Sequence, residues 1–542
     1  MKLQTINHDQ LAKAFLAGAK YLQAEEDKIN ELNVFPVPDG DTGTNMTMTV
    51  MSAAKAVMAL EDRDMKTVSK AMSSGSLRGA RGNSGVILSQ LLRGFSKVVK
   101  TETELNVPII AASFAKATET AYKAVMKPKE GTILTVARGM SDKAAELMDE
   151  TDDILDFLSQ VIEEGDKVLQ KTPDMLPVLK EAGVVDSGGS GLMCVMKGAY
   201  AYLSGEDVDL SFGDEDAGAK VEKKYEYKLS FVLVPDRNTS HERVDDFASY
   251  LQTGGLVNRL SNNKTYLELD IDTDIPGDII TKAGALGSIH DIAFSNISDK
   301  DGFVKPEEEK EAGNSDQSAG EEMKEFGFVS VSAGEGISRI FSEMGVDQNI
   351  TGGQTMNPST DDILSAVEKV NAKTVFVLPN NKNIILAANQ TVHLCEDKKV
   401  IVIPTATIPQ GITALINFLP DKSAEENEKT MKAEIANVKT GQITYAVRNT
   451  TIDEKEIKAG DFMGIGDKGI LSVGASRDEV FLEMLHNMVD DESSLITIYY
   501  GADVTEAEAS EVKDMVASEF KGIEVELENG GQPVYYFIIS VE

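Results

Sequence analysis

The sequence predicts a multidomain protein with an all-α N-terminal domain, a small α+β middle domain and an α/β C-terminal domain. Three observations predict this fold class. Apolar residues recur at helical spacing up to about residue 205, strand-like alternation begins near Lys223, and beyond residue 325 short β-branched runs alternate with helical runs. A nearly uninterrupted polar stretch separates the last two regions. We therefore expect domains at residues 1–205, 220–297 and 326–542, with an acidic linker at 298–325.

The N-terminal domain begins with helical runs, and a distinctive acidic loop follows the first of them. Helices are expected around 11–15, 46–60, 109–126 and 133–148. The loop from Asn33 to Asn45 holds two carboxylates, Asp39 and Asp41, on either side of Gly40. Such a pair on a loop stiffened by prolines suits Mg²⁺, which prefers oxygen ligands. An ordinary acidic turn before a helix explains the same residues equally well. A calcium EF-hand loop is excluded, because its required Gly and Glu positions hold Thr44 and Val50.

A second loop, rich in glycine and serine, runs from Ser73 to Gly85 and leads into a helical run at 86–95. Backbone N–H groups at a helix N-terminus beside small residues form a cradle for anions. Asn83 and Ser84 are also residue types that cap helix N-termini. A flexible linker followed by a capped helix is the alternative interpretation. The loop is neither a Walker loop nor a dinucleotide fingerprint.

Two further loops have the same character. Lys127–Thr135 opens a helix and carries the hydroxyl of Thr132, and Gly183–Gly191 is a Gly/Ser turn with one acid, Asp186. Each is a weak signal by itself. Four loops of this kind between helical segments are typical of the loops at one end of a helical barrel.

The C-terminal region is expected to contain parallel α/β units. Short β-branched runs at 328–331, 375–378 and 400–403 are bounded by turn residues. Gly334 and Gly336 follow the first of these strands and open a helix. The third glycine of a dinucleotide fingerprint is missing, because Arg339 stands in its place, so NAD binding is not predicted.

Composition excludes several classes of protein. The formal charge of −36 over 542 residues disfavours nucleic acid and anionic lipid surfaces as partners. Cys194 and Cys395 stand in apolar sequence surroundings and predict core residues, not a disulfide framework. No apolar run is long enough to span a membrane, and the N-terminus lacks an apolar signal core, so we expect a cytoplasmic protein.

Several of these motifs together resemble a known family. Residues 1 to about 205 resemble the nucleotide-binding L subunit of dihydroxyacetone kinases. The whole chain resembles the ATP-binding subunit of bacterial fatty-acid kinase, a DAK2-domain protein. The resemblance is carried by 33–45, 79–85, 131–135, 182–191, Gly334–Gly336 and Gly352–Ser359.

The resemblance implies an ATP- and Mg²⁺-dependent kinase with defined site residues. Asp39, Asp41 and Asn33 are expected to hold Mg²⁺. Asp39, Asp41 and Thr44 are expected to be catalytic. Contacts to ATP are expected from a larger set: Thr44, Asn45, Asn83, Ser84, Gly85, Thr132 and Asp186. The acceptor would be a fatty-acid carboxylate presented by a separate DegV-like fatty-acid-binding protein, giving an acyl phosphate. The C-terminal domain would dock that partner, and a homodimer remains open.

The proposed acceptor agrees with the scarcity of histidine in this chain. A carboxylate is ionised at neutral pH and needs no general base, whereas a sugar alcohol benefits from one. No long apolar tunnel is readable in the sequence, which agrees with a delivered acyl chain. Five basic residues are candidates to neutralise developing charge: Arg78, Arg81, Lys127, Lys129 and Arg138.

One departure from the family concerns the middle domain. Asp270 and Asp272 stand where the family has paired histidines, so a zinc site there is in doubt. Two alternatives to the fatty-acid kinase stay open. One is a dihydroxyacetone-type kinase for a small molecule, and the other is a non-catalytic nucleotide-binding regulator.

Overall fold

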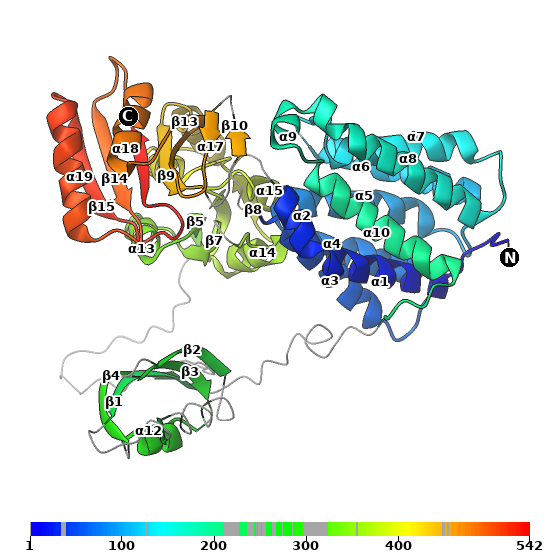
Figure 1. Cartoon of the computed structure of the whole chain (residues 1–542), viewed down its shortest axis with the longest axis horizontal. Helices are drawn as coiled ribbons and strands as arrows, with labels where there is room; N and C mark the ends of the chain where they lie inside the picture. The colour runs from blue at the N-terminus through cyan, green and yellow to red at the C-terminus, as the bar shows by residue number, and fades with distance from the viewer. Residues whose placement is uncertain are drawn as a thin grey trace. The chain divides into compact units, whose positions relative to one another are not determined.

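The computed structural model describes most of the chain, in two units. Described are residues 2–33, 40–125, 127–210, 227–235, 243–244, 247, 251, 256–262, 267–273, 275–284, 286–296, 323–353, 356–446, 450–452, 455–467 and 469–542. The first unit combines residues 1–210 with 320–542, and the second comprises 211–319 (Figure 1). The second unit is therefore inserted into the first along the chain. No described helix is long and apolar enough to cross a bilayer.

The first part of the larger unit, here called the helical domain, contains only helices among its described elements. They are α1 (His8–Ala24), α2 (Glu26–Leu32), α3 (Thr42–Met58), α4 (Met65–Arg78), α5 (Gly82–Val99), α6 (Val107–Ala124), α7 (Ile133–Leu147), α8 (Ile154–Met175), α9 (Pro177–Ala182) and α10 (Ser187–Ser204). Capping boxes define the starts of α1 and α4, where Asn7 and Asp64 accept from the backbone N–H three residues on. The predicted helical character of this domain is confirmed, and closure into a barrel stays a prediction.

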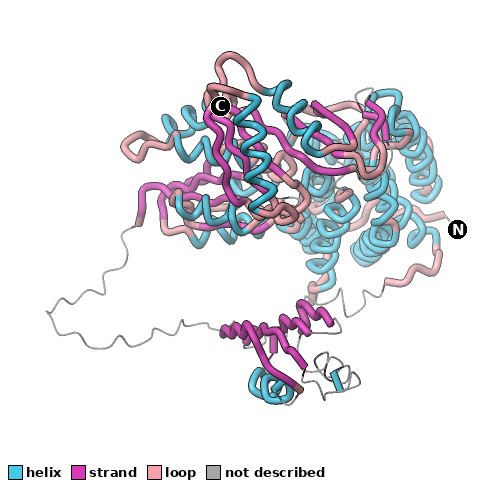
Figure 2. The backbone as a smooth tube through the Cα atoms, turned by 60° about the vertical axis from the view of Figure 1, so that its left-hand side comes forward, coloured by secondary structure: helices cyan, strands magenta, loops and turns pink. Residues whose placement is uncertain are grey.

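The second part of the larger unit, here called the α/β domain, holds two large sheets and a third sheet of two strands. Its elements are β5 (Lys324–Ser332), α13 (Glu335–Glu343), β6 (Gln348–Thr351), α14 (Thr360–Lys369), β7 (Ala372–Leu378), α15 (Ile385–Leu394), β8 (Lys399–Val402), α16 (Ile408–Ile416), α17 (Ala424–Glu434), β9 (Lys439–Tyr445), β10 (Thr450–Ile452), β11 (Lys455–Ile457), β12 (Phe462–Gly466), β13 (Gly469–Gly474), α18 (Arg477–Met488), β14 (Leu495–Tyr500), α19 (Glu506–Glu519), β15 (Glu524–Asn529) and β16 (Phe537–Val541). Figure 2 distinguishes these strands from the helices by colour. β5 starts within the range predicted as linker.

The first sheet has the order β6-β5-β7-β8 and is parallel throughout, as the sequence predicts. Both of its faces are covered, which explains its continuous apolar strands. One face packs Phe328 and Phe376 against α13, α16 and α17. On the other face, Val329 and Val331 pack against α14 and α15 in a core cluster that also includes Ala80 and Val86 of the helical domain. The two domains of this unit therefore share a continuous apolar core.

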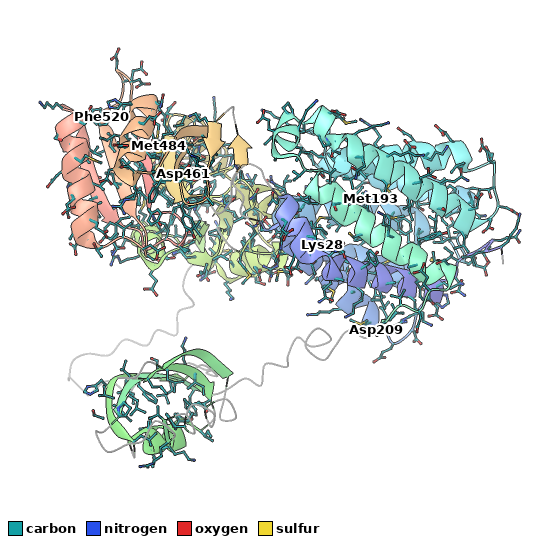
Figure 3. All side chains as sticks on the ribbon, in the orientation of Figure 1. Lys28, Met193, Asp209, Asp461, Met484 and Phe520 are labelled. Carbon is teal, nitrogen blue, oxygen red and sulfur yellow. The ribbon has the colours of Figure 1, made fainter. Side chains whose placement is uncertain are left out.

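The second sheet has the order β13-β12-β9-β16-β14-β15 and is antiparallel except between β14 and β15. The expectation of parallel units for the whole C-terminal region is therefore wrong for this sheet. Helices α18 and α19 cover it, with Met484 and Phe520 (labelled in Figure 3) in its core. Strands whose sequence alternates can pair in either direction, so their composition does not decide the topology.

The described elements of the inserted unit include an antiparallel sheet of order β2-β3-β1-β4 and the helix α12. These elements are β1 (Tyr227–Pro235), β2 (Leu256–Asn262), β3 (Leu267–Thr273), α12 (Pro276–Gly284) and β4 (Gly287–Asn296). Leu267, Leu269 and Ile271 of β3 are buried in the core of this unit. The side chains of Asp270 and Asp272 lie outside the described residues, so the question of a metal there stays open.

Candidate functional site

The N-termini of four helices of the helical domain meet, and they carry the loops that the sequence singled out. A side chain at Gly85 of α5 would collide with Thr49 of α3, and Gly191 of α10 lies against Met46 of α3. The carboxylate of Asp186, at the start of α10, accepts hydrogen bonds from the backbone of Gly189 and of Ile133, the first residue of α7. The starts of α3, α5, α7 and α10 are therefore neighbours.

In three of these four helices the N-cap residue itself does not cap the helix. The N-cap residues of α3, α5 and α7 are Asp41, Arg81 and Thr132, and none of them hydrogen-bonds the first turn of its helix through its side chain. Side chains from elsewhere accept two of the first-turn donors: Asn30 accepts from the N–H of Thr44 at 3.1 Å, and Asp186 accepts from the N–H of Ile133. The remaining N–H groups of these turns can donate to another acceptor. The positive ends of the helix dipoles favour an anion at the same place. Several such ends together fit the phosphate chain of a nucleotide.

Asp41 is the member of the predicted acidic pair that the structure describes. Its Oδ2 accepts a hydrogen bond of 2.7 Å from the side-chain amide of Asn357, and its Oδ1 lies 3.5 Å from the Nδ2 of Asn33. Burial raises the pKa of Asp41, and hydrogen bonds from Asn45 and Asn357 lower it in part. A half-buried carboxylate that does not cap its helix and is short of positive charge is well suited to bind a cation.

Asn33 is buried at the end of α2, and the structure therefore brings Asp41 and Asn33, two of the three predicted cation ligands, together. The third, Asp39, lies outside the described residues. Among the described residues, no group of three His, Cys, Asp or Glu side chains is arranged to hold a metal. A hard cation at this loop would thus depend on amide and phosphate oxygens as well as on carboxylates.

Thr44 and Asn45 occupy different environments in the first turn of α3. The Thr44 hydroxyl donates to Glu26 at 2.7 Å and accepts from Asn30 at 3.1 Å, so it faces α2. Asn45 is buried beside Asp41 and Gly82. The structure thus places Asn45 beside Asp41, whereas it places the hydroxyl of Thr44, predicted to be catalytic and to contact ATP, in a network with two residues of α2 that the sequence did not indicate.

The start of α5 is shaped by glycine. Gly82 has φ of +58°, and a Cβ there would lie 2.7 Å from Nδ2 of Asn45. The absence of side chains at Gly82 and Gly85 lets α5 approach α3 and keeps the first turn open. Ser84 is half-buried in this turn. The side-chain amide of Asn83 donates to Oδ1 of Asn383 in the α/β domain at 3.1 Å.

Thr132 and Asp186 lie at the starts of α7 and α10. The Thr132 hydroxyl donates to the carbonyl of Lys129. Asp186 caps α10 through Gly189 at 2.6 Å, and burial raises its pKa to about 6. Asp186 therefore ties two of the converging helices together, a role that the resemblance did not imply.

Three of the five basic candidates form ion pairs in the described structure. Arg138 pairs with Glu130 at 2.7 Å, and Arg78 pairs with Asp361 at 3.4 Å. Arg81 pairs with Asp362 at 3.2 Å and also donates to the backbone carbonyl of Asn357 at 2.8 Å. Arg78 and Arg81 therefore bind residues of the α/β domain. The sequence could not indicate these contacts, because the partners lie far along the chain.

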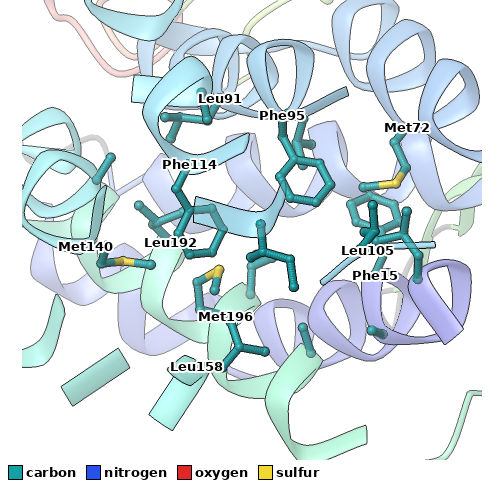
Figure 4. Close-up of a pocket in the computed structure, with 18 of the residues that line it drawn as sticks. Phe15, Met72, Leu91, Phe95, Leu105, Phe114, Met140, Leu158, Leu192 and Met196 are labelled. Carbon is teal, nitrogen blue, oxygen red and sulfur yellow. The ribbon is translucent and has the colours of Figure 1, made fainter. Parts of the chain in front are cut away.

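A separate apolar cavity lies inside the helical domain (Figure 4). It has a volume of about 160 Å³ and is lined by residues that include Phe15, Phe95, Phe114, Leu192 and Met196. An apolar cavity of ~150 Å³ stays dry and holds a molecule about the size of benzene. This cavity lacks the polar groups that a nucleotide needs.

Comparisons with known proteins match both domains of the larger unit. Residues 36–201 match the DAK2 domain, and residues 327–542 match the C-terminal domain of FakA-like fatty acid kinase proteins. The chain is 41% identical to Protein YloV of Bacillus subtilis over 557 aligned positions that cover all of both chains. The chain belongs to the DAK2-domain family of FakA-like fatty acid kinase proteins. Another full-length relative in this family, 37% identical, is the uncharacterized protein SAR1202 of Staphylococcus aureus.

Two solved structures are distantly similar to parts of this family member. The DegV family protein Cg2579 of Corynebacterium glutamicum aligns with 40% of this chain and 96% of its own, at 11% identity and a TM-score of 0.32. The dihydroxyacetone kinase from C. freundii, in complex with AMP-PNP and Mg²⁺, aligns with 40% of this chain and 48% of its own, at 14% identity and a TM-score of 0.30. Likeness at this level supports no argument about the site.

Proposed function

We propose that this protein transfers the γ-phosphoryl group of ATP, with Mg²⁺, to a fatty-acid carboxylate and so forms an acyl phosphate. The acyl chain is presented by a separate, DegV-like fatty-acid-binding protein in the cytoplasm. Membership of a kinase-named family supports a kinase-like activity. The observation that carries the proposal is the meeting of three helix starts, none capped by its own N-cap residue, beside the half-buried carboxylate of Asp41.

The residues of the site have defined tasks in this reaction. Bound Mg·ATP supplies the phosphoryl group and the positive charge that offsets its oxygens. Asp41, with Asn33 and Asp39, holds the cation, and backbone N–H groups in the first turns of α3, α5 and α7, other than those of Thr44 and Ile133, bind phosphate oxygens. Asn45, Asn83, Ser84, Gly85 and Thr132 line these helix starts, where we place the nucleotide. Asp186 holds the starts of α7 and α10 together through its hydrogen bonds.

A carboxylate acceptor agrees with the residues around Asp41. The hydrogen-bonding neighbours of Asp41 among the described residues are the amides of Asn33, Asn45 and Asn357, not a histidine or a lysine. A fatty-acid carboxylate is already ionised at neutral pH, so its oxygen attacks the γ-phosphorus without giving up a proton. The bond from that phosphorus to the bridging oxygen of ADP breaks, and ADP leaves.

The proposal is tested by supplying ATP, Mg²⁺ and a fatty acid loaded on a DegV-type binding protein, and by trapping acyl phosphate with hydroxylamine. We expect one hydroxamate for each ADP formed. Dihydroxyacetone serves as the competing acceptor. ADP formation that depends on dihydroxyacetone would favour the small-molecule kinase. Nucleotide binding without turnover on either acceptor would favour the non-catalytic regulator.

A further inference from the structure

The α/β domain contributes a buried residue to the proposed cation site. Asn357 lies 316 positions beyond Asp41 in the sequence, and its side-chain amide donates to Oδ2 of Asp41 at 2.7 Å. The same amide nitrogen lies 3.5 Å from Oδ1 of Asn45. Asn357 is 4% exposed, so water cannot readily replace it as a donor.

The backbone holds Asn357 in place independently of its side chain. Arg81 donates to the backbone carbonyl of Asn357 at 2.8 Å and pairs with Asp362 at 3.2 Å. The backbone N–H of Thr360 donates to the carbonyl of Ala80 at 3.1 Å. Three contacts thus fix residues 357–362 against the loop that opens α5, and none of them uses the Asn357 amide.

We propose that Asn357 is a positioning residue for the cation: its amide orients the Asp41 carboxylate, so that the site is complete only when the α/β domain is docked. This inference rests on the proposed function. Each carboxylate oxygen has two lone pairs, so Oδ2 can accept from Asn357 and still bind a cation. Hydrogen bonds to a ligating carboxylate fix its orientation, and losing one typically lowers metal affinity or activity ~10–100-fold.

The experiment uses the full-length protein and Mn²⁺, whose free form is measured by electron paramagnetic resonance. Mn²⁺ is titrated with and without a non-hydrolysable ATP analogue into three proteins: wild type, Asn357→Leu and Gln390→Met. Leucine has nearly the shape of asparagine but no donor. Gln390 is the matched control, because its contact to Gln90 at 2.8 Å joins the same two domains at a place without an acidic partner.

We expect Asn357→Leu to raise the Kd for Mn²⁺ about 10-fold or more and Gln390→Met to leave it unchanged. Asn357→Gln, which keeps an amide donor, should bind Mn²⁺ more tightly than Asn357→Leu. An unchanged Kd in Asn357→Leu would overturn the proposal. A lower Kd would also overturn it, and would mean that the amide competes with the cation. Failure of the acyl-phosphate assay leaves this measurement intact, because it reports cation binding and not turnover.

Discussion

Replacing Gly85 by alanine tests whether α3 and α5 must touch for the site to form. A Cβ at Gly85 would lie 2.3 Å from the hydroxyl oxygen of Thr49. That hydroxyl is fully buried, donates to the carbonyl of Asn45 at 2.6 Å and accepts from the N–H of Arg81 at 3.2 Å. It cannot retreat without weakening both hydrogen bonds.

The expected change in the free energy of unfolding is the sum of two destabilising contributions and one stabilising contribution. Overpacking costs about 1–3 kcal/mol, and weakening two hydrogen bonds costs up to about 1 kcal/mol each. Alanine gains about 1 kcal/mol over glycine in a helix. We therefore expect Gly85→Ala to lower the free energy of unfolding by about 1–3 kcal/mol.

A double-mutant cycle with Thr49→Ala isolates the clash. Without the hydroxyl, the nearest atom to the new Cβ is the backbone oxygen of Asn45 at 3.1 Å, and the Cβ of residue 49 lies at 3.4 Å. Gly85→Ala should then cost less than in wild type, and the coupling energy should exceed about 1 kcal/mol. Urea unfolding followed by far-ultraviolet circular dichroism measures all four proteins. An equal loss in both backgrounds, or no loss in wild type, would refute the reasoning.

Three further predictions concern charge and the cavity. Asp41→Asn should lower phosphoryl transfer by about two orders of magnitude or more. Near-normal turnover would exclude the role assigned to Asp41. In metal-free urea unfolding the same variant should be at least as stable as wild type, because burial disfavours the ionised carboxylate. Asp186 has a pKa of about 6 against an ordinary value of 3.8, so wild type should lose stability relative to Asp186→Asn as pH rises between these values. A pH-independent difference in urea midpoints would contradict this. Benzene should raise the thermal midpoint by filling the apolar cavity, and no rise would argue against an accessible cavity there.

The features that the sequence predicted well are local. Helical spacing and β-branched runs depend on residues a few positions apart, and these patterns gave the helices of the first domain and the parallel strands β5, β7 and β8. Asn83, Asn45 and Asp41 were likewise recognisable from their loops, and the structure places them at neighbouring helix starts. Their roles in binding stay predictions.

The features that were missed are contacts between distant segments. A basic residue shows its charge in the sequence but not its partner. Arg81 was therefore one of five candidates to neutralise developing charge, and its ion pair with Asp362 could not be predicted. Asn357 belongs to a noticeable Gly-rich motif, yet nothing local indicates that its amide meets Asp41. The antiparallel pairing of β9, β12 and β16 also depends on tertiary packing that strand composition does not encode.

The apolar core shared by the two domains has a consequence for synthesis on the ribosome. Gln90 and its partner Gln390 are separated by 300 positions, a distance that translation covers in about 15–60 s at 5–20 residues per second. During that interval, the surface of α5 that carries Val86 has emerged without the strands and helices that later bury it. The nascent helical domain therefore exposes an apolar surface before the α/β domain that buries it has been synthesised. We expect this surface to bind a chaperone that acts during translation.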